Sequence, residues 1–345
     1  MKEQYDVRTC DARSLSHLVK ILFLTRRAYP HIGGVEKHTL KVAQELTTRG
    51  HTVTILAENH DPLHLSSGQY TFHSVDFNFF SCGRDSFLKK FHIWWWMIKN
   101  VRIFALADVI HIHDIVIWYL PLRFLLFWKP VYATFHGYEG VFPPTRKAIF
   151  LRRLSELLTS KTIDVGAYLH TWYGTHPDEV MYGGIDNIDF SPTSGRHVVL
   201  VGRLEKDIGM ELYIKFFRKL KGYTIDIYGD GSYRSSLLQY GTVHGFVKNS
   251  EKFIKNADIV CASSYLTILE ALAFGKRVVA LYDNPLKKDY LEQAPFAKWL
   301  YLSDNPEKLP DLKKFSQKEL GELQSVLQTM TWHHVTDIYE SLWKK

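Results

Sequence analysis

The segment from Ile259 to Leu281 is the part of the sequence that most constrains the fold. It opens and closes with short apolar runs of the kind that form buried strands. Between these runs, Ser263 and Ser264 are residue types that begin helices, and Gly275 is the type that ends them. The apolar residues from Ser264 to Gly275 recur at helical spacing. This order of strand, helix and strand predicts an α/β fold.

Glu270 is the one acidic residue in the expected helix. The free N–H groups at a helix N-terminus bind anions such as phosphate. A carboxylate in the first turn or so repels phosphate, but it accepts hydrogen bonds from sugar hydroxyls. The combination points to a nucleotide, with its diphosphate on the helix end and its ribose on Glu270. The alternative is that Glu270 only favours the helix N-terminus through the helix dipole.

The chain has 345 residues, of which 46% are hydrophobic, so it is long enough for two domains with buried cores. Its three cysteines, Cys10, Cys82 and Cys261, are widely spaced. This spacing excludes a disulfide framework or zinc pattern and fits a reducing compartment. No signal segment opens the sequence, and no apolar run approaches the ~20 residues of a membrane span. We therefore expect a cytoplasmic protein.

Two series of strand-like runs flank the turn-rich segment 182–192, which is typical of a linker. The expected strands are 18–24, 51–56, 70–75, 109–114, 131–135 and 162–165, then 197–202, 223–228, 242–244, 258–261, 277–281 and 298–302. The helical patterns include 86–106, 145–159 and the final amphipathic pattern 332–343. We predict a leader over residues 1–17, an N-terminal domain over 18–190, a C-terminal domain over 191–325, and a helix over 326–345 that crosses back to the first domain.

Polar residues follow three of the expected strands in the first half. Gly33 and Gly34 follow the first of them, His113 and Asp114 end another, and His136 ends a third. Ligands of open α/β sheets bind beyond the carboxyl ends of the strands. Each residue alone is more often structural, but together they favour a binding crevice.

Aromatic and basic residues alternate between Arg84 and Arg153, where Lys and Arg outnumber Asp and Glu. Such a mixture suits a helix lying on an anionic bilayer. The alternative is a core helix with a solvated basic edge. Both interpretations stay open, and the first of them predicts peripheral contact with the inner face of an anionic membrane.

Two further ligand classes receive little support. His170 and His176 are six residues apart, which does not put them on one helical face, so we expect loop or interdomain contacts and no metal. The net charge of +7 is modest and no nucleic-acid-binding module is present, so nucleic acid is not expected as a partner.

Several segments, taken in order, resemble family 4 of the glycosyltransferases, and the similarity covers nearly all of the chain after residue 17. They are PHIGGVEKH at 30–38, RGHTVT at 49–54, YGGID at 182–186, VGRLE at 201–205, GDG at 229–231, LEALAFGK at 269–276, and WHHV at 332–335 with Tyr339. The resemblance implies the GT-B fold, in which two Rossmann-like domains face each other across a cleft. It also implies transfer of a sugar from a nucleotide-diphosphate donor, with retention of anomeric configuration and without a metal.

The resemblance also implies roles for individual residues. Glu270 would hold the ribose hydroxyls, and Arg203, a permanent forked cation, would contact the diphosphate. The amides of Thr267, Ile268 and Leu269 would complete the anion site. Gly33 and Gly34 would let the first domain approach the phosphate.

Four more positions concern the donor and acceptor pockets. His136 matches a position that lines the acceptor or donor-sugar pocket, and Gly231 lies in a donor-binding loop. The family has a Lys five residues after the Arg, where this chain has Ile208; Lys206 is the nearest substitute. The family also has a second Glu eight residues before Glu270, where this chain has Ala262.

We expect a glycosyltransferase with catalytic residues His136, Arg203 and Glu270, no permanently bound cofactor, and a glycan or lipid-linked acceptor. The two departures from the family pattern leave a second hypothesis open, a nucleotide-sugar-binding protein on a decayed transferase scaffold. A third hypothesis is a nucleotide-sugar epimerase of the same fold, for which His113, Asp114, His136 and Glu139 are the acid–base candidates.

Overall fold

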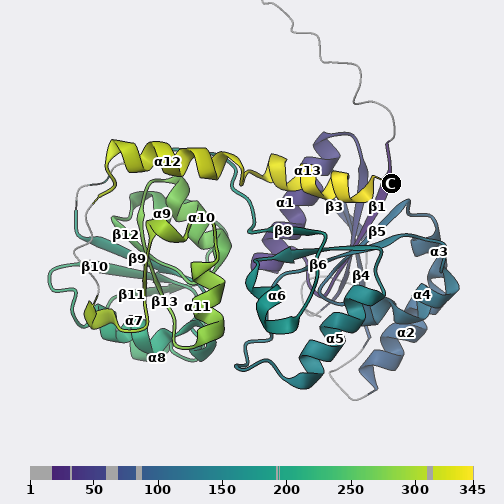
Figure 1. Cartoon of the computed structure of the whole chain (residues 1–345), viewed down its shortest axis with the longest axis horizontal. Coiled ribbons are helices and arrows are strands. Elements are labelled where there is room, and N and C mark those ends of the chain that lie inside the picture. The colour runs from purple at the N-terminus through teal and green to yellow at the C-terminus, as the bar shows by residue number, and fades with distance from the viewer. Residues whose placement is uncertain are drawn as a thin grey trace, which may run out of the picture.

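A computed structural model describes residues 18–31, 33–59, 69–82, 88–191, 193, 195–308 and 314–344. The expected leader, residues 1–17, lies outside the described residues. The described chain forms two lobes, each built on a parallel sheet with helices on both faces (Figure 1). Parallel strands covered on both faces read as continuous apolar runs, and β1, Lys20–Thr25, is buried at every residue after the first.

The first sheet has eight strands in the order β3-β4-β2-β1-β5-β6-β7-β8. Its bounds after β1 are β2 Thr52–Glu58, β3 Gln69–Phe72, β4 Val75–Phe80, β5 Val109–His113, β6 Val131–Phe135, β7 Lys161–Val165 and β8 Glu179–Met181. All pairings are parallel except that of β3 with β4. The central six strands thus have the order of a doubly wound sheet.

The helices of the first lobe cover the two faces of this sheet. They are α1 Gly34–Thr48, α2 Lys89–Lys99, α3 Val101–Ala105, the 3-10 turn η1 Val116–Tyr119, α4 Leu120–Leu125, α5 Arg146–Leu157 and α6 Tyr168–Tyr173. Helix α1 packs against β2 and β4, whereas α2 and α5 contact η1 in a layer that also includes α4.

The second sheet has six parallel strands in the order β11-β10-β9-β12-β13-β14. Its bounds are β9 His197–Val201, β10 Thr224–Tyr228, β11 Thr242–Gly245, β12 Ile259–Cys261, β13 Arg277–Leu281 and β14 Leu300–Ser303. Its helices are α7 Met210–Phe217, α8 Arg234–Leu237, α9 Glu251–Asn256, α10 Tyr265–Ala273, α11 Pro285–Glu292 and α12 Gln317–Gln328, with 3-10 turns η2 Lys206–Ile208, η3 Ala297–Trp299 and η4 Pro306–Lys308.

The fold class expected from the sequence is confirmed: two Rossmann-like sheets form one molecule, and the last helix crosses back to the first lobe. The domain boundaries at residues 190 and 325 remain predictions. One expected strand is wrong. Instead of a single strand at 70–75, a hairpin turns at His73 and Ser74, both with positive φ, and β4 continues to Phe80. The alternation of buried and exposed residues in β4 shows why a second strand forms there.

The chain crosses between the lobes twice, and the two crossings are joined by backbone hydrogen bonds. The Ile185 N–H donates to the Met330 carbonyl at 2.9 Å, and the Trp332 N–H donates to the Ile185 carbonyl at 3.1 Å. Gly184 is required here, because a Cβ at that position would lie 2.7 Å from the Trp332 ring. The linker and the return segment therefore form one hydrogen-bonded strip.

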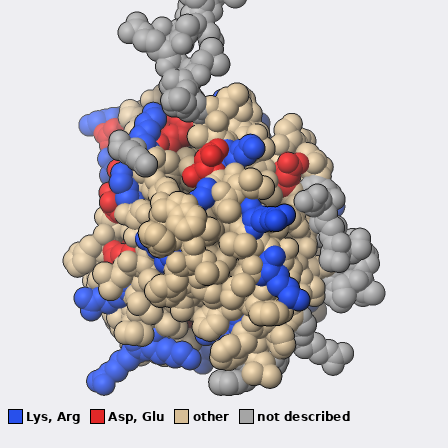
Figure 2. Space-filling model, turned by 90° about the vertical axis from the view of Figure 1, so that its right-hand side faces the viewer, with Lys and Arg blue, Asp and Glu red and all other residues tan. Residues whose placement is uncertain are grey.

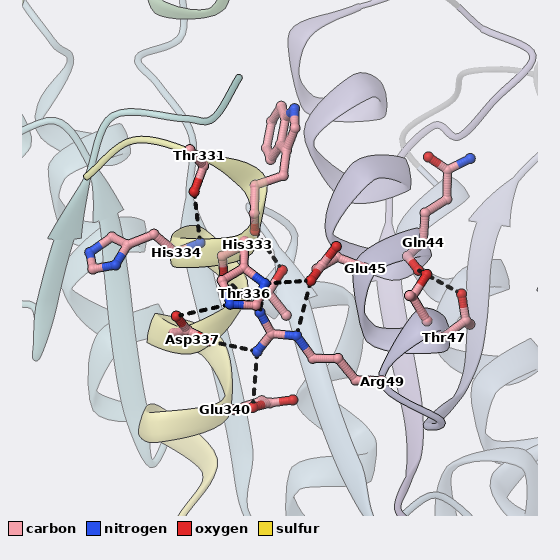
Figure 3. Close-up of polar contacts among 12 residues, drawn as sticks. Gln44, Glu45, Thr47, Arg49, Thr331, His333, His334, Thr336, Asp337 and Glu340 are labelled. Atoms are coloured by element: carbon pink, nitrogen blue, oxygen red, sulfur yellow. Dashed lines mark hydrogen bonds and ion pairs between the residues drawn. The ribbon is translucent and has the colours of Figure 1, made fainter. Parts of the chain in front are cut away.

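Helix α13, Trp332–Trp343, follows the second crossing and packs on α1 (Figures 1 and 3). Arg49, at the C-terminal end of α1, donates to Asp337 at 2.7 Å, to Glu340 at 3.2 Å and to the His333 carbonyl at 2.8 Å. The Arg49 side chain is 17% exposed, so solvent screens these charges less than on an open surface. This network fixes the last helix to the first lobe.

Candidate active site

The two sheets bring their topological switch points to the same cleft. In the first sheet the strand order reverses between β1 and β5, and in the second between β9 and β12. Crevices for ligands form at the carboxyl ends of strands at such points. The Tyr138 hydroxyl crosses the cleft and donates to the Asp207 carbonyl at 3.2 Å. The loops after these strands therefore face one another.

A cavity of about 980 Å³ lies between these loops. The first lobe contributes Tyr138, Glu139, Gly140 and Phe142 to its wall. The second lobe contributes Arg203, Glu205, Lys206, Asp207, Asp230, Gly231, Ser232, Phe246, Asp283 and Asn284. The volume is at the upper end of the range for small-molecule pockets, so a nucleotide and a sugar fit together.

Three of the residues expected to bind the donor line this cavity: Arg203, Lys206 and Gly231. The Arg203 guanidinium donates to Asp207 at 2.7 Å, and the side chain is 63% exposed. Lys206 is exposed and starts the turn η2. Gly231 has a φ of 153°, and a Cβ there would lie 2.5 Å from the Leu204 carbonyl, so only glycine fits this loop. Two cations therefore face the cavity from one loop.

Both departures from the family pattern lie in apolar surroundings. Ile208 is buried in the core of the second lobe, and Ala262 is buried at the end of β12. Neither position therefore presents a charged group to the cavity.

Lys287, on α11, is a buried cation that sequence reasoning did not identify. Its ammonium donates to the Ser263 carbonyl at 2.7 Å and lies over the Tyr290 ring. Burial lowers the Lys287 pKa to about 8. The Asp207 carboxylate opposes this shift, and the positive charge of Arg203 adds to it. An ammonium has three donors, and the described residues accept from one of them. The signal in the sequence was weak, because a lysine in the first turn of a helix usually faces solvent.

Helix α10 begins at the carboxyl end of β12 and presents free amides. The N–H groups of Leu266 and Thr267 have no partner among the described residues, and Ser264 does not cap them through its side chain. Ile268 donates to the Ser264 carbonyl at 3.0 Å, and Leu269 lies one residue further into the helix. Of the three amides expected to bind phosphate, only that of Thr267 is therefore available, and Leu266 supplies a second.

Glu270 is the sixth residue of α10, in the second turn rather than the first. The helix-dipole explanation is therefore wrong, because that effect fades within the first turn. The carboxylate instead accepts a hydrogen bond from Lys37 of α1 at 2.7 Å, and Lys37 also contacts Glu251 at 3.2 Å. Burial raises the Glu270 pKa, although Lys37 opposes the shift. Burial alone would lower the Lys37 pKa, but the two carboxylates outweigh it and the net shift is upward.

Gly33 and Gly34 lie at the start of α1, as expected. Gly33 is the N-cap residue in extended conformation, and a Cβ there would lie 2.1 Å from a Glu36 oxygen. A Cβ at Gly34 would meet nothing within 4 Å, so this backbone borders open space. Glu36 places a carboxylate in the first turn of α1, beside this backbone. An incoming phosphate would meet that negative charge.

His136 lies in a cluster of histidines beneath the cleft and does not line the cavity. His113 Nδ1 and His136 Nε2 are 2.9 Å apart, and the His38 and His136 rings are 4.8 Å apart. Burial, followed by the positive charge of Arg152, lowers the His136 pKa to about 3. His136 is therefore neutral at pH 7 and can exchange hydrogen bonds but carries no charge.

Asp114 adjoins this cluster at the end of β5, with a φ of 65°. It accepts a hydrogen bond from the His136 N–H at 2.8 Å, and Arg152 lies 3.8 Å away. Burial raises the Asp114 pKa to about 6. The positive charge of Arg152 and the hydrogen bond from the His136 N–H oppose this shift. Arg152 also donates to Glu139, which lines the cavity. The sequence identified Asp114 and Glu139, whereas the buried Arg152 that connects them was not recognised.

The His170 and His176 rings lie 5.0 Å apart, and His170 Nδ1 contacts the Thr175 carbonyl. Within the described ranges, no group of three or more His, Cys, Asp and Glu side chains has an arrangement that would hold a metal ion.

Two doubly wound sheets that meet at their switch points define the GT-B class of architecture. The sequence agrees with this class: the profile described as Glycosyltransferase Family 4 matches residues 32–187, and Glycosyl transferases group 1 matches residues 195–300. The chain belongs to the glycosyltransferases of this family 4 type. A search of curated protein sequences gives no match.

Solved structures show the same fold at low sequence identity. A glycosyltransferase from Rickettsia africae is 16% identical, with a TM-score of 0.67 over 95% of this chain and 98% of that one. Anabaena HepE, solved with UDP and glucose, is 16% identical, with a TM-score of 0.63 over 95% and 100%. Trehalose-6-phosphate synthase OtsA is 11% identical, with a TM-score of 0.66 over 94% and 99%.

Proposed function

We propose that this glycosyltransferase moves a sugar from a nucleoside-diphosphate donor to a glycan or lipid-linked acceptor, with retention of configuration and without a metal. The main observation behind this proposal is the cleft between the switch points. Arg203 and Lys206 line its cavity, and α10 begins with two free amides at the carboxyl end of β12, a strand at the switch point. The solved HepE structure, which contains UDP and glucose, supports a nucleotide as part of the donor.

The donor diphosphate is proposed to lie between Arg203, Lys206 and the start of α10. The N–H groups of Leu266 and Thr267 would donate to phosphate oxygens, as helix N-termini do in many nucleotide sites. As the diphosphate leaves, its growing negative charge needs fixed cations, which Arg and Lys provide without a metal. The Lys287 ammonium donates to the Ser263 carbonyl, just before α10, and its other two N–H groups have no acceptor among the described residues. We infer that it supplies the charge that Ile208 does not.

Glu270 is proposed to accept hydrogen bonds from the ribose hydroxyls. Its carboxylate is already held in one orientation by Lys37, so it is preorganised to accept. Phe246 lines the cavity and is exposed, which suits stacking against a base. Gly231 and Gly34 would give the backbone room beside the diphosphate. These roles remain proposals that substitution has to test.

The acceptor is proposed to enter from the first lobe, along the loop from Tyr138 to Phe142. Asp114 and Glu139 lie at this side, and a carboxyl with a pKa of about 6 is suited to accept a proton from an acceptor hydroxyl. His136, neutral and hydrogen-bonded to His113, would orient the acceptor or the donor sugar without carrying charge. We place the reaction in the cytoplasm, on the inner face of a membrane.

A donor screen tests the proposal. The chain would be incubated with a panel of uridine, guanosine, adenosine and thymidine diphosphate sugars, and hydrolysis or transfer would be followed by mass spectrometry. We expect turnover of at least one donor, unaffected by a chelator, and an anomeric product signal in NMR that matches the donor configuration. Loss of activity on chelation would exclude the metal-free mechanism, and an inverted product would exclude retention.

The second candidate, a nucleotide-sugar-binding protein on a decayed scaffold, gains support from the burial of Ile208 and Ala262 in apolar surroundings. It predicts calorimetric binding of nucleotide sugars with neither hydrolysis nor transfer. The epimerase hypothesis has a different signature, since it predicts a changed sugar in the absence of any acceptor. Product analysis without acceptor therefore separates the three hypotheses.

A further inference from the structure

The outer end of the first lobe carries a second feature that the transfer reaction does not explain. Helix α2 has two apolar faces. Ile93 and Met97 point into the core, whereas Phe91, Trp95 and Ile98, spaced four and three residues apart, are exposed on the opposite side. A helix on the surface of a globular domain usually exposes a polar face, so this outward stripe needs a partner.

The exposed apolar surface continues over the neighbouring elements. Phe124, at 69% exposure, lies near the end of α4, and Phe127 and Trp128 follow that helix at 72% and 63%. Helix α4 packs against α2, and α5 contacts the adjacent turn η1, so the three helices form one layer. Figure 1 shows α2 and α4 at the end of the molecule that lies away from the second lobe, and α5 along the lower side of the first lobe, nearer the cleft.

Helix α5 adds a groove of about 430 Å³ to this layer. Phe150 and Leu157 are exposed on its outer side, and Arg146 and Arg153 lie at the same helical face. An apolar groove with basic edges accommodates acyl chains next to anionic headgroups.

The excess of basic residues in the layer favours an anionic partner. Six basic side chains are exposed and form no ion pair with any described residue: Lys90, Lys99, Arg102, Arg146, Lys147 and Arg153. Glu156 is the one acidic residue within the helices α2, α3, α4 and α5 themselves, and it accepts a hydrogen bond from the His176 N–H. Figure 2 shows Lys and Arg, but no Asp or Glu, in the lowest part of this end of the molecule.

We propose that the exposed layer of α2, α4 and α5 docks flat on an anionic bilayer. The aromatic side chains would enter the headgroup region, and the six basic residues would pair with lipid phosphates. None of the helices in the described ranges combines the length and hydropathy that a bilayer-spanning segment requires. A protein partner is less favoured, because protein interfaces are depleted in Lys, whereas this surface exposes three lysines that form no ion pair with a described residue.

The docked orientation would bring the cavity to the membrane. Phe142 lines the cavity, and Arg146 begins α5 and its groove. Four residues of chain span at most ~14 Å, so the cleft opens beside the docked surface. A lipid-linked acceptor would therefore reach the cavity without leaving the bilayer. This last step rests on the proposed function, whereas the docking itself does not.

Vesicle flotation of the full chain tests the docking without donor or acceptor. We expect binding to mixed phosphatidylcholine–phosphatidylglycerol vesicles, weaker binding in high salt, and little binding to pure phosphatidylcholine. Replacing Lys90, Lys99 and Lys147 by Ala should weaken binding ~100-fold, since each basic residue near an anionic surface is worth about fivefold. Trp95→Ser with Phe127→Ser should weaken it by roughly tenfold or more.

Matched controls come from the second lobe. Leu238 is 59% exposed and Lys221 is exposed, so Leu238→Ser and Lys221→Ala remove the same kinds of side chain elsewhere. Wild-type binding in the lysine variant, or equal binding to both vesicle types, would overturn the proposal. A second result would also overturn it: a dimer in sedimentation that the Trp95 and Phe127 substitutions dissociate, together with unchanged vesicle binding by the same variant. Nucleotide binding by the same variants shows whether the reaction site is unaffected. If the aromatic variant does not fold, the lysine variant alone decides.

Discussion

Glu270→Gln is the substitution that tests the site most directly. The residue is on α10, is 7% exposed, and holds Lys37 at 2.7 Å across the cleft. Glutamine has nearly the same shape, so the helix and its packing should remain. What changes is the charge of the side chain that is proposed to accept hydrogen bonds from the ribose.

The size of the effect follows from the two hydrogen bonds that the ribose hydroxyls would make. A hydrogen bond to a charged group contributes roughly 1 kcal/mol more than one to a neutral group. Two such bonds give about 2 kcal/mol, which corresponds to roughly 30-fold weaker binding. Isothermal titration with the nucleoside diphosphate that binds best in a panel would measure this ratio.

Lys37 complicates the experiment, because Glu270→Gln also leaves it with Glu251 as its remaining carboxylate. Glu251→Gln is the matched control, since it removes the 3.2 Å contact to the same ammonium and leaves Glu270 intact. We expect the control to bind the nucleotide within about threefold of the wild type, because exposed pairs contribute little. If both variants bind equally well, or Glu270→Gln binds like the wild type, Glu270 is an interdomain contact and no ribose ligand.

Three further predictions follow from the same geometry. Arg203→Ala should lower turnover by about 100-fold or more, since its guanidinium is proposed to stabilise the departing diphosphate. The melting temperature should not change, because the side chain is exposed; steady-state kinetics and thermal unfolding check both expectations. Lys287→Met should reduce turnover while raising stability at neutral pH. The folded pKa of Lys287, about 8, lies below its ordinary value of 10.5, so between these values the unfolded chain binds the proton and native stability rises with pH. The stability advantage of Lys287→Met should therefore shrink above about pH 8 in urea titrations, and a constant difference would contradict the pKa assignment. Arg49→Ala should destabilise the docking of α13 by about 2 kcal/mol and increase hydrogen exchange in that helix. Arg218→Ala, which removes a guanidinium that donates to Tyr240 in the second lobe, should leave α13 protected.

The parts of the fold that the sequence predicted well are those with strong local patterns. Strand β12, helix α10 and strand β13 are bounded by serines and a glycine, and the final helix lies at Trp332–Trp343, as its amphipathic pattern indicates. The hairpin of β3 and β4 was missed because its turn uses His73 and Ser74, which carry no glycine signal.

The site was harder to predict, because its contacts join distant residues. Lys37 and Glu270 are 233 positions apart, and no local pattern relates a lysine on α1 to a glutamate on α10. Lys287 has an ordinary position near the start of a helix, and only the fold buries it beside Ser263. The cavity-lining residues Arg203 and Gly231 were found because the family motif marks them. Only the fold shows that they line one cavity with Tyr138, which belongs to the opposite lobe.

The paired crossings between the lobes limit how the cleft can open. A single crossing segment would allow the lobes to rotate in several directions. Two crossing segments that are hydrogen-bonded to each other at Ile185 and Trp332 restrict the lobes to rotation about one axis. Rotation about that axis would separate Lys37 from Glu270 and Tyr138 from Asp207. The distance between the two crossing segments would stay constant. Spin labels on opposite sides of the cleft should give one distance without nucleotide and a shorter one with it. Labels on the two crossing segments should give the same distance in both conditions.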